Sequence, residues 1–202
     1  MINKNLKKRI LDISYEKKLS HLGSCLTAVD IIDEIYQTKK LDEKFILSNG
    51  HAALALYCVI EKYEGLDAKK IFEHHGVHPD RCDQCHIYYS TGSLGQGLPA
   101  TVGMALANRE KNVYCLISDG ECSEGSIFEA INVIKKYKIE NLKLHINFNG
   151  WGAYDPTNEQ IIPQVGKWYK TNVNNFPFLK DQDAHYHVMT EEEYKQGLEI
   201  LE

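Results

Sequence analysis

Apolar residues occur along this chain both in short runs and at helical spacing, and the two patterns alternate between residues 113 and 152. Residues 113–117 and 142–148 are short apolar runs, typical of buried strands. Between the runs, four apolar residues recur at helical intervals: Ile127, Ala130, Ile131 and Ile134. A strand, a helix and a strand in this order predict two parallel strands in one sheet.

The remaining pattern adds further helices and one more strand. It predicts a strand over 45–47 and helices over 3–18, 52–63, 66–72, 98–107 and 191–201. Thr27, with Asp30 three residues later, resembles a capping box and predicts the start of another helix. We therefore predict one α/β domain over residues 1–202: a three-layer sandwich with a mostly parallel sheet, and an atypical C-terminal segment over 162–202.

Polar residues follow the two runs at the point where each predicted strand ends. Asp119-Gly120 follows the first run, and Asn149-Gly150 follows the second. Ligands of open parallel sheets bind at the carboxyl ends of strands, and carboxylate and amide oxygens suit Mg²⁺ with a bound phosphate. A magnesium–phosphate site is one interpretation. The other is that these are ordinary turn residues.

Composition and charge exclude several classes of function. Hydrophobic residues are 43% of the chain, charged residues are 25%, and the net charge is −5 without a basic stripe. Nucleic acid is therefore not an expected partner. No apolar run is long enough to cross a bilayer, and the opening residues lack an apolar signal-peptide core, so we expect a cytoplasmic protein without membrane contact. In that setting the six cysteines are expected to be reduced thiols.

Potential ligands are concentrated in the polar loop over residues 73–91. Cys82-x-x-Cys85 lies in this loop with three histidines nearby: His74, His75 and His78. One such pair supplies only two of the four ligands of a zinc site, so the motif alone does not establish one. Cys82-x-x-Cys85-His86 is also the spelling of a haem attachment site, but the missing export signal argues against haem.

Glycines are dense over residues 92–97, immediately before the predicted helix at 98–107. Backbone amides at a helix N-terminus can bind an anion. The segment has no P-loop lysine, and tight packing between loop and helix explains the glycines equally well.

These motifs also resemble a known family. SDGECSEGSIFEA, YKIENL and NFNG together resemble the thiamine-diphosphate motif of transketolases, with Ser118 in place of the usual glycine and Asn149 thirty residues after Asp119. STGSLGQGL resembles the transketolase segment that lines the cofactor. The resemblance implies Mg²⁺ held by Asp119, Asn149 and the main-chain carbonyl of Trp151. It also implies cofactor contacts from Gly92, Leu94, Gly120, Glu121, His51 and His78.

The same resemblance implies the catalytic residues. His51 in SNGHAA matches the family closely, whereas Ser20 and Leu22 around His21, and Val77 before His78, depart from it. These three histidines would line the channel for cofactor and sugar. Glu124 would meet the cofactor-activating glutamate of a complementary domain. His185, which keeps better spacing to the last helix than His187, would supply one more imidazole.

The resemblance extends over residues 10–155 and includes no pyrimidine-binding or C-terminal domain. It implies the N-terminal subunit of a split transketolase, which transfers a two-carbon ketol unit between sugar phosphates. A complementary subunit would complete a heterotetramer or higher assembly. The alternatives are a deoxyxylulose-phosphate synthase relative, a 2-oxoacid dehydrogenase subunit, or a non-catalytic scaffold or regulator. A family strand–helix–strand stretch is missing after residue 165. We therefore expect a sheet shortened at its C-terminal edge, covered by the C-terminal segment or the partner.

Overall fold

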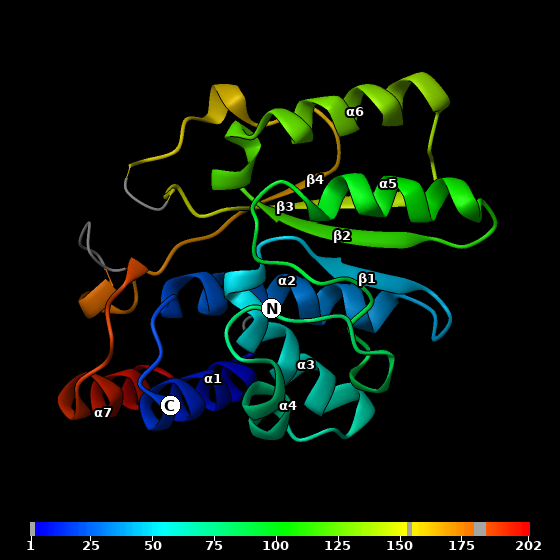
Figure 1. The fold of residues 1–202 in the computed structure, drawn as a ribbon. Coiled ribbons are helices and arrows are strands. Elements are labelled where there is room, and N and C mark those ends of the chain that lie inside the picture. Colours follow the sequence, from blue (N-terminus) through cyan, green and yellow to red (C-terminus); the bar gives the residue numbers. More distant parts are fainter. Residues whose placement is uncertain (1–2, 153–154, 180–184) are drawn as a thin grey trace.

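The computed structural model describes residues 3–152, 155–179 and 185–202 and shows a parallel sheet between two layers of helices (Figure 1). Its strands are β1 (Lys44–Leu47), β2 (Val113–Ser118), β3 (Leu142–Phe148) and β4 (Lys167–Lys170). They lie in the order β1-β2-β3-β4, and each neighbouring pair is parallel. The predicted three-layer α/β fold is therefore confirmed.

Helices cover both faces of the sheet. The helices are α1 (Lys4–Lys17), α2 (Leu22–Thr38), α3 (Ala53–Glu64), α4 (Ala68–His75), α5 (Gly97–Ala107), α6 (Gly125–Tyr137) and α7 (Glu191–Ile200). Figure 1 shows α5 and α6 on one face, with α1, α2 and α3 on the other. Because both faces are covered, the central strand β2 is buried along its whole length, which explains its unbroken apolar run.

Alternate residues of the strands enter two separate hydrophobic cores. In β2, Tyr114 and Leu116 join the core formed with α1, α2 and α3. Cys115 and Ile117 join the core formed with α5 and α6. Because successive side chains of a strand point to opposite faces of the sheet, β2 contributes to the cores on both faces.

One predicted helix start was wrong. Thr27 lies inside α2, where its hydroxyl donates to the carbonyl of Gly23 at 3.0 Å. The helix begins five residues earlier, after His21, whose φ of 62° places it in the left-handed region. A Ser/Thr hydroxyl inside a helix can bond the preceding turn in this way, so the Thr27–Asp30 spacing did not mark a cap.

The connection from β3 to β4 contains only a short 3-10 turn, Glu159–Ile161, among its described residues. The sheet ends at β4 in the described part of the chain, in agreement with the predicted shortening. Strand β4 belongs to the C-terminal segment and covers the edge of β3 by pairing with it from His145 to Phe148. Farther along the segment, Tyr194 of α7 stacks on Tyr15 of α1 with ring centroids 4.5 Å apart. Within the described ranges, every helix is too short or too polar to cross a membrane.

Candidate active site

Asp119 lies immediately after β2, at the carboxyl end of the sheet, and its side chain is fully buried. Its Oδ2 accepts hydrogen bonds from the backbone N–H of Gly150 at 2.8 Å and from the hydroxyl of Thr157 at 2.6 Å. Its Oδ1 accepts from the N–H of Gly120 at 3.1 Å. Burial raises the pKa of the Asp119 carboxyl, and these donors oppose the rise.

The turn after β3 lies against this carboxylate. Asn149 Oδ1 accepts from the N–H of Trp151 at 2.9 Å, and Gly150 has a φ of 88°. This left-handed turn aims the Gly150 amide at Asp119. Trp151 is 44% exposed. The structure therefore brings the carboxyl ends of β2 and β3 together around Asp119, as parallel neighbours require.

Glu121 lies beneath the glycine-rich segment and is also fully buried. Its Oε1 accepts from the Ser48 hydroxyl at 2.6 Å and from the Gly95 N–H at 2.9 Å. Its Oε2 accepts from the Ser118 N–H at 3.0 Å. Both oxygens serve protein donors, so the side chain connects the end of β1, the glycine-rich segment and the end of β2. The expected contact between Glu121 and the cofactor stays a prediction.

The glycine-rich segment, residues 92–97, passes close to its neighbours because it lacks side chains. A Cβ on Gly97 would lie 2.5 Å from Ser48 Oγ and 2.7 Å from Ser48 Cα. A Cβ on Gly92 would lie 3.1 Å from the His78 ring. Leu94 between them is half-buried. The segment is therefore held against β1 on one side and against His78 on the other.

Three histidines from distant parts of the chain form a cluster. The ring of His21 lies 5.4 Å from that of His51 and 4.4 Å from that of His185, measured between centroids. The His51 and His185 rings are 5.7 Å apart. His78 is exposed but close enough to affect the titration of His21 and His51. His187 lies elsewhere and pairs with Glu193 at 2.9 Å.

Electrostatics keep this cluster neutral. Burial, with help from His185, lowers the pKa of His21 to about 4. Burial and the neighbouring His21 lower the pKa of His51 to about 3, and burial lowers the pKa of His185. At neutral pH these imidazoles can therefore donate and accept hydrogen bonds without carrying charge.

Sequence reasoning missed two residues of this region. Asn49 is 1% exposed, follows Ser48 in the chain shortly before His51, and has no hydrogen-bond partner for either side-chain polar atom among the described residues. Thr157 donates to Asp119 from a loop with no recognisable motif. Asn49 could have been found, since it follows the apolar run at 45–47 closely. Thr157 gave no sequence signal.

The comparisons with known proteins agree with this geometry. A family model described as "Transketolase, thiamine diphosphate binding domain" matches residues 9–170. The chain belongs to this family. It is similar to transketolase of Homo sapiens, with 36% identity over 157 residues, covering 67% of this chain and 25% of the human protein. It is also similar to one subunit of the apulose-4-phosphate transketolase of Phocaeicola vulgatus, with 31% identity over 166 residues, covering 71% and 58% of the two chains.

Solved transketolases share the fold. The structure of transketolase from Campylobacter jejuni superposes with a TM-score of 0.81 over 98% of this chain and 42% of that chain, at 19% identity. This transketolase domain thus spans about a quarter of the human relative and 58% of the Phocaeicola vulgatus protein.

The residues of this transketolase domain fit the Mg²⁺ ion that a diphosphate needs. Asp119 is a fully buried carboxylate, and within the described part of the chain its hydrogen-bond donors are all neutral. A buried charge without a cationic partner is expensive, and a divalent cation would compensate it. The Asn149 side-chain oxygen, which accepts from the Trp151 N–H, and the main-chain carbonyls of the same turn are hard oxygen donors of the kind that Mg²⁺ takes.

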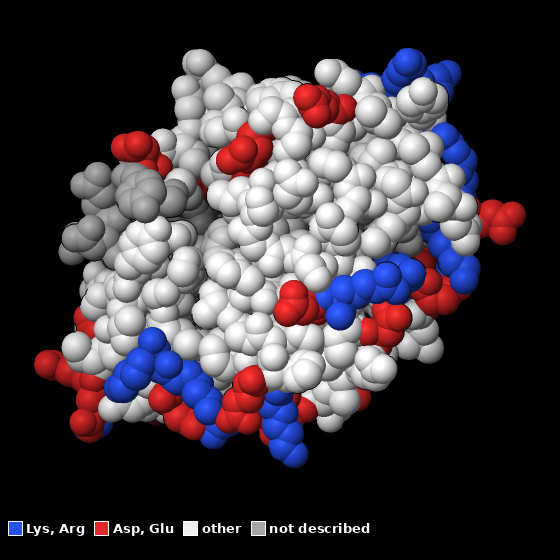
Figure 2. All heavy atoms as spheres, viewed as in Figure 1, with Lys and Arg blue, Asp and Glu red and all other residues white. Residues whose placement is uncertain are grey.

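Glu124 occupies a different position from the buried acids. It is exposed, it precedes α6, and its side chain makes no cap hydrogen bond to that helix. Phe128, one turn along α6, is 46% exposed. Figure 2 shows few charged side chains over α5, whereas charges gather over α1, α4 and α7 and at the far end of α6. The surface over α5 is therefore mostly uncharged.

Proposed function

We propose that this chain is the diphosphate-binding subunit of a split transketolase. Asp119, Asn149 and the carbonyl of Trp151 would hold Mg²⁺, and Mg²⁺ would hold the diphosphate of thiamine diphosphate. With a complementary subunit, the protein would transfer a two-carbon ketol unit between sugar phosphates. The observation that carries the proposal is the fully buried Asp119 carboxylate, joined to the turn after the neighbouring strand by the Gly150 amide.

Thiamine diphosphate, when bound, supplies the stabilisation of a carbanion. The residues of this chain position the reactants and move protons. The backbone of residues 92–97 would line the cofactor, with Gly92 allowing close approach beside His78. Glu121 fixes this segment through the Gly95 amide, so it acts as a positioning residue below the site.

The histidine cluster would bind the sugar hydroxyls. Ser20 Oγ lies 2.7 Å from Nδ1 of His21, which fixes that ring and leaves Nε2 for a substrate hydroxyl. A neutral imidazole can accept a hydroxyl proton at Nε2 and return it later in the reaction. His51 and His185, which contact His21, would orient neighbouring hydroxyls in the same manner.

A partner chain is part of this proposal. The chain spans about a quarter of the human transketolase, and the Phocaeicola vulgatus relative is itself named as one subunit of a transketolase. The sparsely charged surface over α5, next to the exposed Phe128 at the start of α6, has the composition of an interface centre, and Glu124 is exposed beside it. We propose that the complementary subunit docks here, brings its activating glutamate to Glu124, and forms a heterotetramer or higher assembly.

The direct test is cofactor binding by the Asp119→Asn variant, co-purified with the complementary subunit. Removing one partner of a buried charge pair costs about 2–5 kcal/mol, so thiamine diphosphate should bind roughly 30-fold more weakly or worse in the presence of Mg²⁺. Titration calorimetry measures this affinity. Asp155→Asn is the matched control, because Asp155 is exposed and contributes its backbone carbonyl to the same loop. Equal affinities of Asp119→Asn and the wild type would reject the assignment.

The reaction type needs its own assay. Ketol transfer between sugar phosphates should be detectable in the assembled complex, and decarboxylation of pyruvate should not. The reverse result would favour a 2-oxoacid dehydrogenase or synthase relative. Cofactor binding with neither activity would indicate a scaffold or regulator.

A further inference from the structure

A second cluster of potential ligands lies away from the histidine cluster, where α4 meets the loop that leads to the glycine-rich segment. His75 is the last residue of α4, and the 3-10 turn Asp83–Cys85 follows Cys82 in the loop. Cys82 and Ile87 pair through two backbone hydrogen bonds of 2.8 and 2.9 Å. The Cys85 N–H donates to the Cys82 carbonyl at 3.1 Å, which folds the two cysteines onto one turn.

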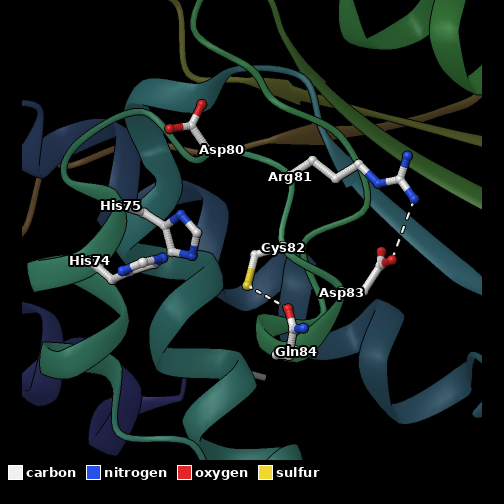
Figure 3. Close-up of a pocket in the computed structure, with 7 residues that line it drawn as sticks. All are labelled: His74, His75, Asp80, Arg81, Cys82, Asp83 and Gln84. Carbon is white, nitrogen blue, oxygen red and sulfur yellow. Dashed lines mark hydrogen bonds and ion pairs between the residues drawn. The ribbon is translucent and has the colours of Figure 1, made fainter.

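Three ligand atoms converge there. One ring nitrogen of His75 and the sulfurs of Cys82 and Cys85 all lie within 4.8 Å of one another. Figure 3 shows the His75 ring facing Cys82, with His74 turned to the other side. The Nε2 atom of His75 is buried and has no hydrogen-bond partner among the described residues. A buried nitrogen beside two sulfurs thus lacks the partner that such an atom requires.

These two cysteines differ from the other four of the chain. Cys25, Cys58, Cys115 and Cys122 are buried in the hydrophobic cores. Cys82 and Cys85 are half-buried free thiols, and Cys82 lines a surface pocket of about 570 Å³. Sulfur and imidazole together are the ligand set that zinc prefers.

We propose that His75, Cys82 and Cys85 bind one Zn²⁺ ion, whose fourth position opens on this pocket and is filled by water. Two thiolates and a neutral imidazole balance the charge of Zn²⁺. Burial and the neighbouring Cys82 raise the pKa of the Cys85 thiol to about 11, so the metal must displace a proton as it binds. Burial and His74 lower the pKa of His75, which keeps that imidazole in the neutral form a metal needs.

The ion would anchor the loop over residues 76–91 to α4. This loop carries His78 and ends at Gly92, and its two ends are joined by the hydrogen bond from Thr91 N–H to the Pro79 carbonyl at 3.1 Å. The metal would therefore have a structural role, holding the segment that places His78 against Gly92. This site is independent of the proposed function, because its ligands differ from those of Mg²⁺.

The test measures metal content in the full chain, purified without a histidine tag from zinc-supplemented cells under reducing conditions. We expect about one zinc per chain by plasma mass spectrometry. Cobalt added to the chelator-treated protein should give thiolate charge-transfer bands and the intense visible bands of a tetrahedral ion. Cys82→Ser, Cys85→Ser and His75→Ala should each lower zinc affinity by at least about tenfold.

Two matched controls should keep their zinc. His74→Ala removes the adjacent histidine, which lies on the far side of His75 (Figure 3). Asp83→Asn changes a residue between the cysteines whose carboxylate lies 3.4 Å from Arg81. Hydrogen exchange over residues 76–91 should rise in the zinc-free wild type.

Several outcomes would overturn the proposal. One is wild-type protein with less than about a tenth of a zinc per chain and no cobalt bands. Another is loss of zinc from His74→Ala equal to that from His75→Ala. A third is a Cys82–Cys85 disulfide in protein freshly purified under reducing conditions. None of these results depends on thiamine diphosphate, so they leave the Asp119 test unaffected.

Discussion

Replacing Glu121 with glutamine tests whether a buried carboxylate positions the glycine-rich segment. Glutamine has the same shape but keeps only one acceptor oxygen. In wild type, Oε1 accepts from Ser48 and Gly95, and Oε2 accepts from Ser118. If the glutamine NH₂ group took the position of Oε1, it would face two hydrogen-bond donors. We therefore expect the NH₂ group at the position of Oε2, where it faces the Ser118 N–H.

The magnitude follows from that orientation. Leaving a buried donor unsatisfied costs about 1–3 kcal/mol, and a hydrogen bond to a charged group contributes about 1.5–3 kcal/mol. One effect offsets these losses: burial raises the pKa of Glu121, so a neutral side chain relieves part of the desolvation penalty. We therefore expect Glu121→Gln to lower the free energy of unfolding by about 2 kcal/mol.

Urea unfolding followed by circular dichroism measures this change, with the slope of the transition as a check that the unfolded state is unaltered. Glu124→Gln is the matched control, because Glu124 is exposed on the same turn and should change stability by less than about 0.5 kcal/mol. Hydrogen exchange at the Gly95 amide should also accelerate in Glu121→Gln. A Glu121→Gln midpoint equal to that of the control would refute the positioning role.

Two further predictions concern the histidines and the glycines. The pKa of His51 lies near 3 against 6.5 for an ordinary histidine, so the unfolded chain binds more protons between these values and stability falls as the pH is lowered through that window. Acid titration of unfolding should therefore show a shallower loss for His51→Gln than for wild type, and parallel curves would contradict the assignment. Gly97→Ala should destabilise the domain by about 1–3 kcal/mol, despite the better helix propensity of alanine, because its Cβ would meet Ser48 Cα at 2.7 Å. Thermal unfolding beside Gly103→Ala, where a Cβ meets nothing within 4 Å, separates packing from propensity.

Local pattern predicted the layers of this fold because each central element carries its own signal. The apolar run at 142–148 coincides with β3, and the helical spacing from Ile127 to Ile134 lies within α6. β4 had no such signal, because Lys167–Lys170 places two aromatic residues between two lysines and is a strand only through pairing with β3. The prediction of a helix start at Thr27 was wrong because this residue lies inside the helix, where its hydroxyl donates to the Gly23 carbonyl.

The candidate site, like the fold, contains residues that local motifs indicated and residues whose contacts come from distant segments. Motifs indicated Asp119 and the three clustered histidines. Asp119 follows the end of β2, and His21 and His51 come just before α2 and α3. The use of Glu121 could not be read from its motif, because its partners Ser48 and Gly95 are contributed by distant segments. Thr157 became visible only when the chain was folded, through its bond to Asp119, and the fold singled out Asn49 through an unsatisfied amide although its place after the run at 45–47 was already a signal.

The passage from β3 to β4, which has no α-helix among its described residues, has a consequence for how this protein can vary. The stretch between residues 149 and 166 both spans the gap to the outermost strand and supplies the Gly150 and Thr157 donors to Asp119. Inserting or deleting residues there would shift the register of β4 and the hydrogen bonds of Asp119 together. The architecture of the sheet edge and the hydrogen bonding of Asp119 are therefore mechanically linked in this domain.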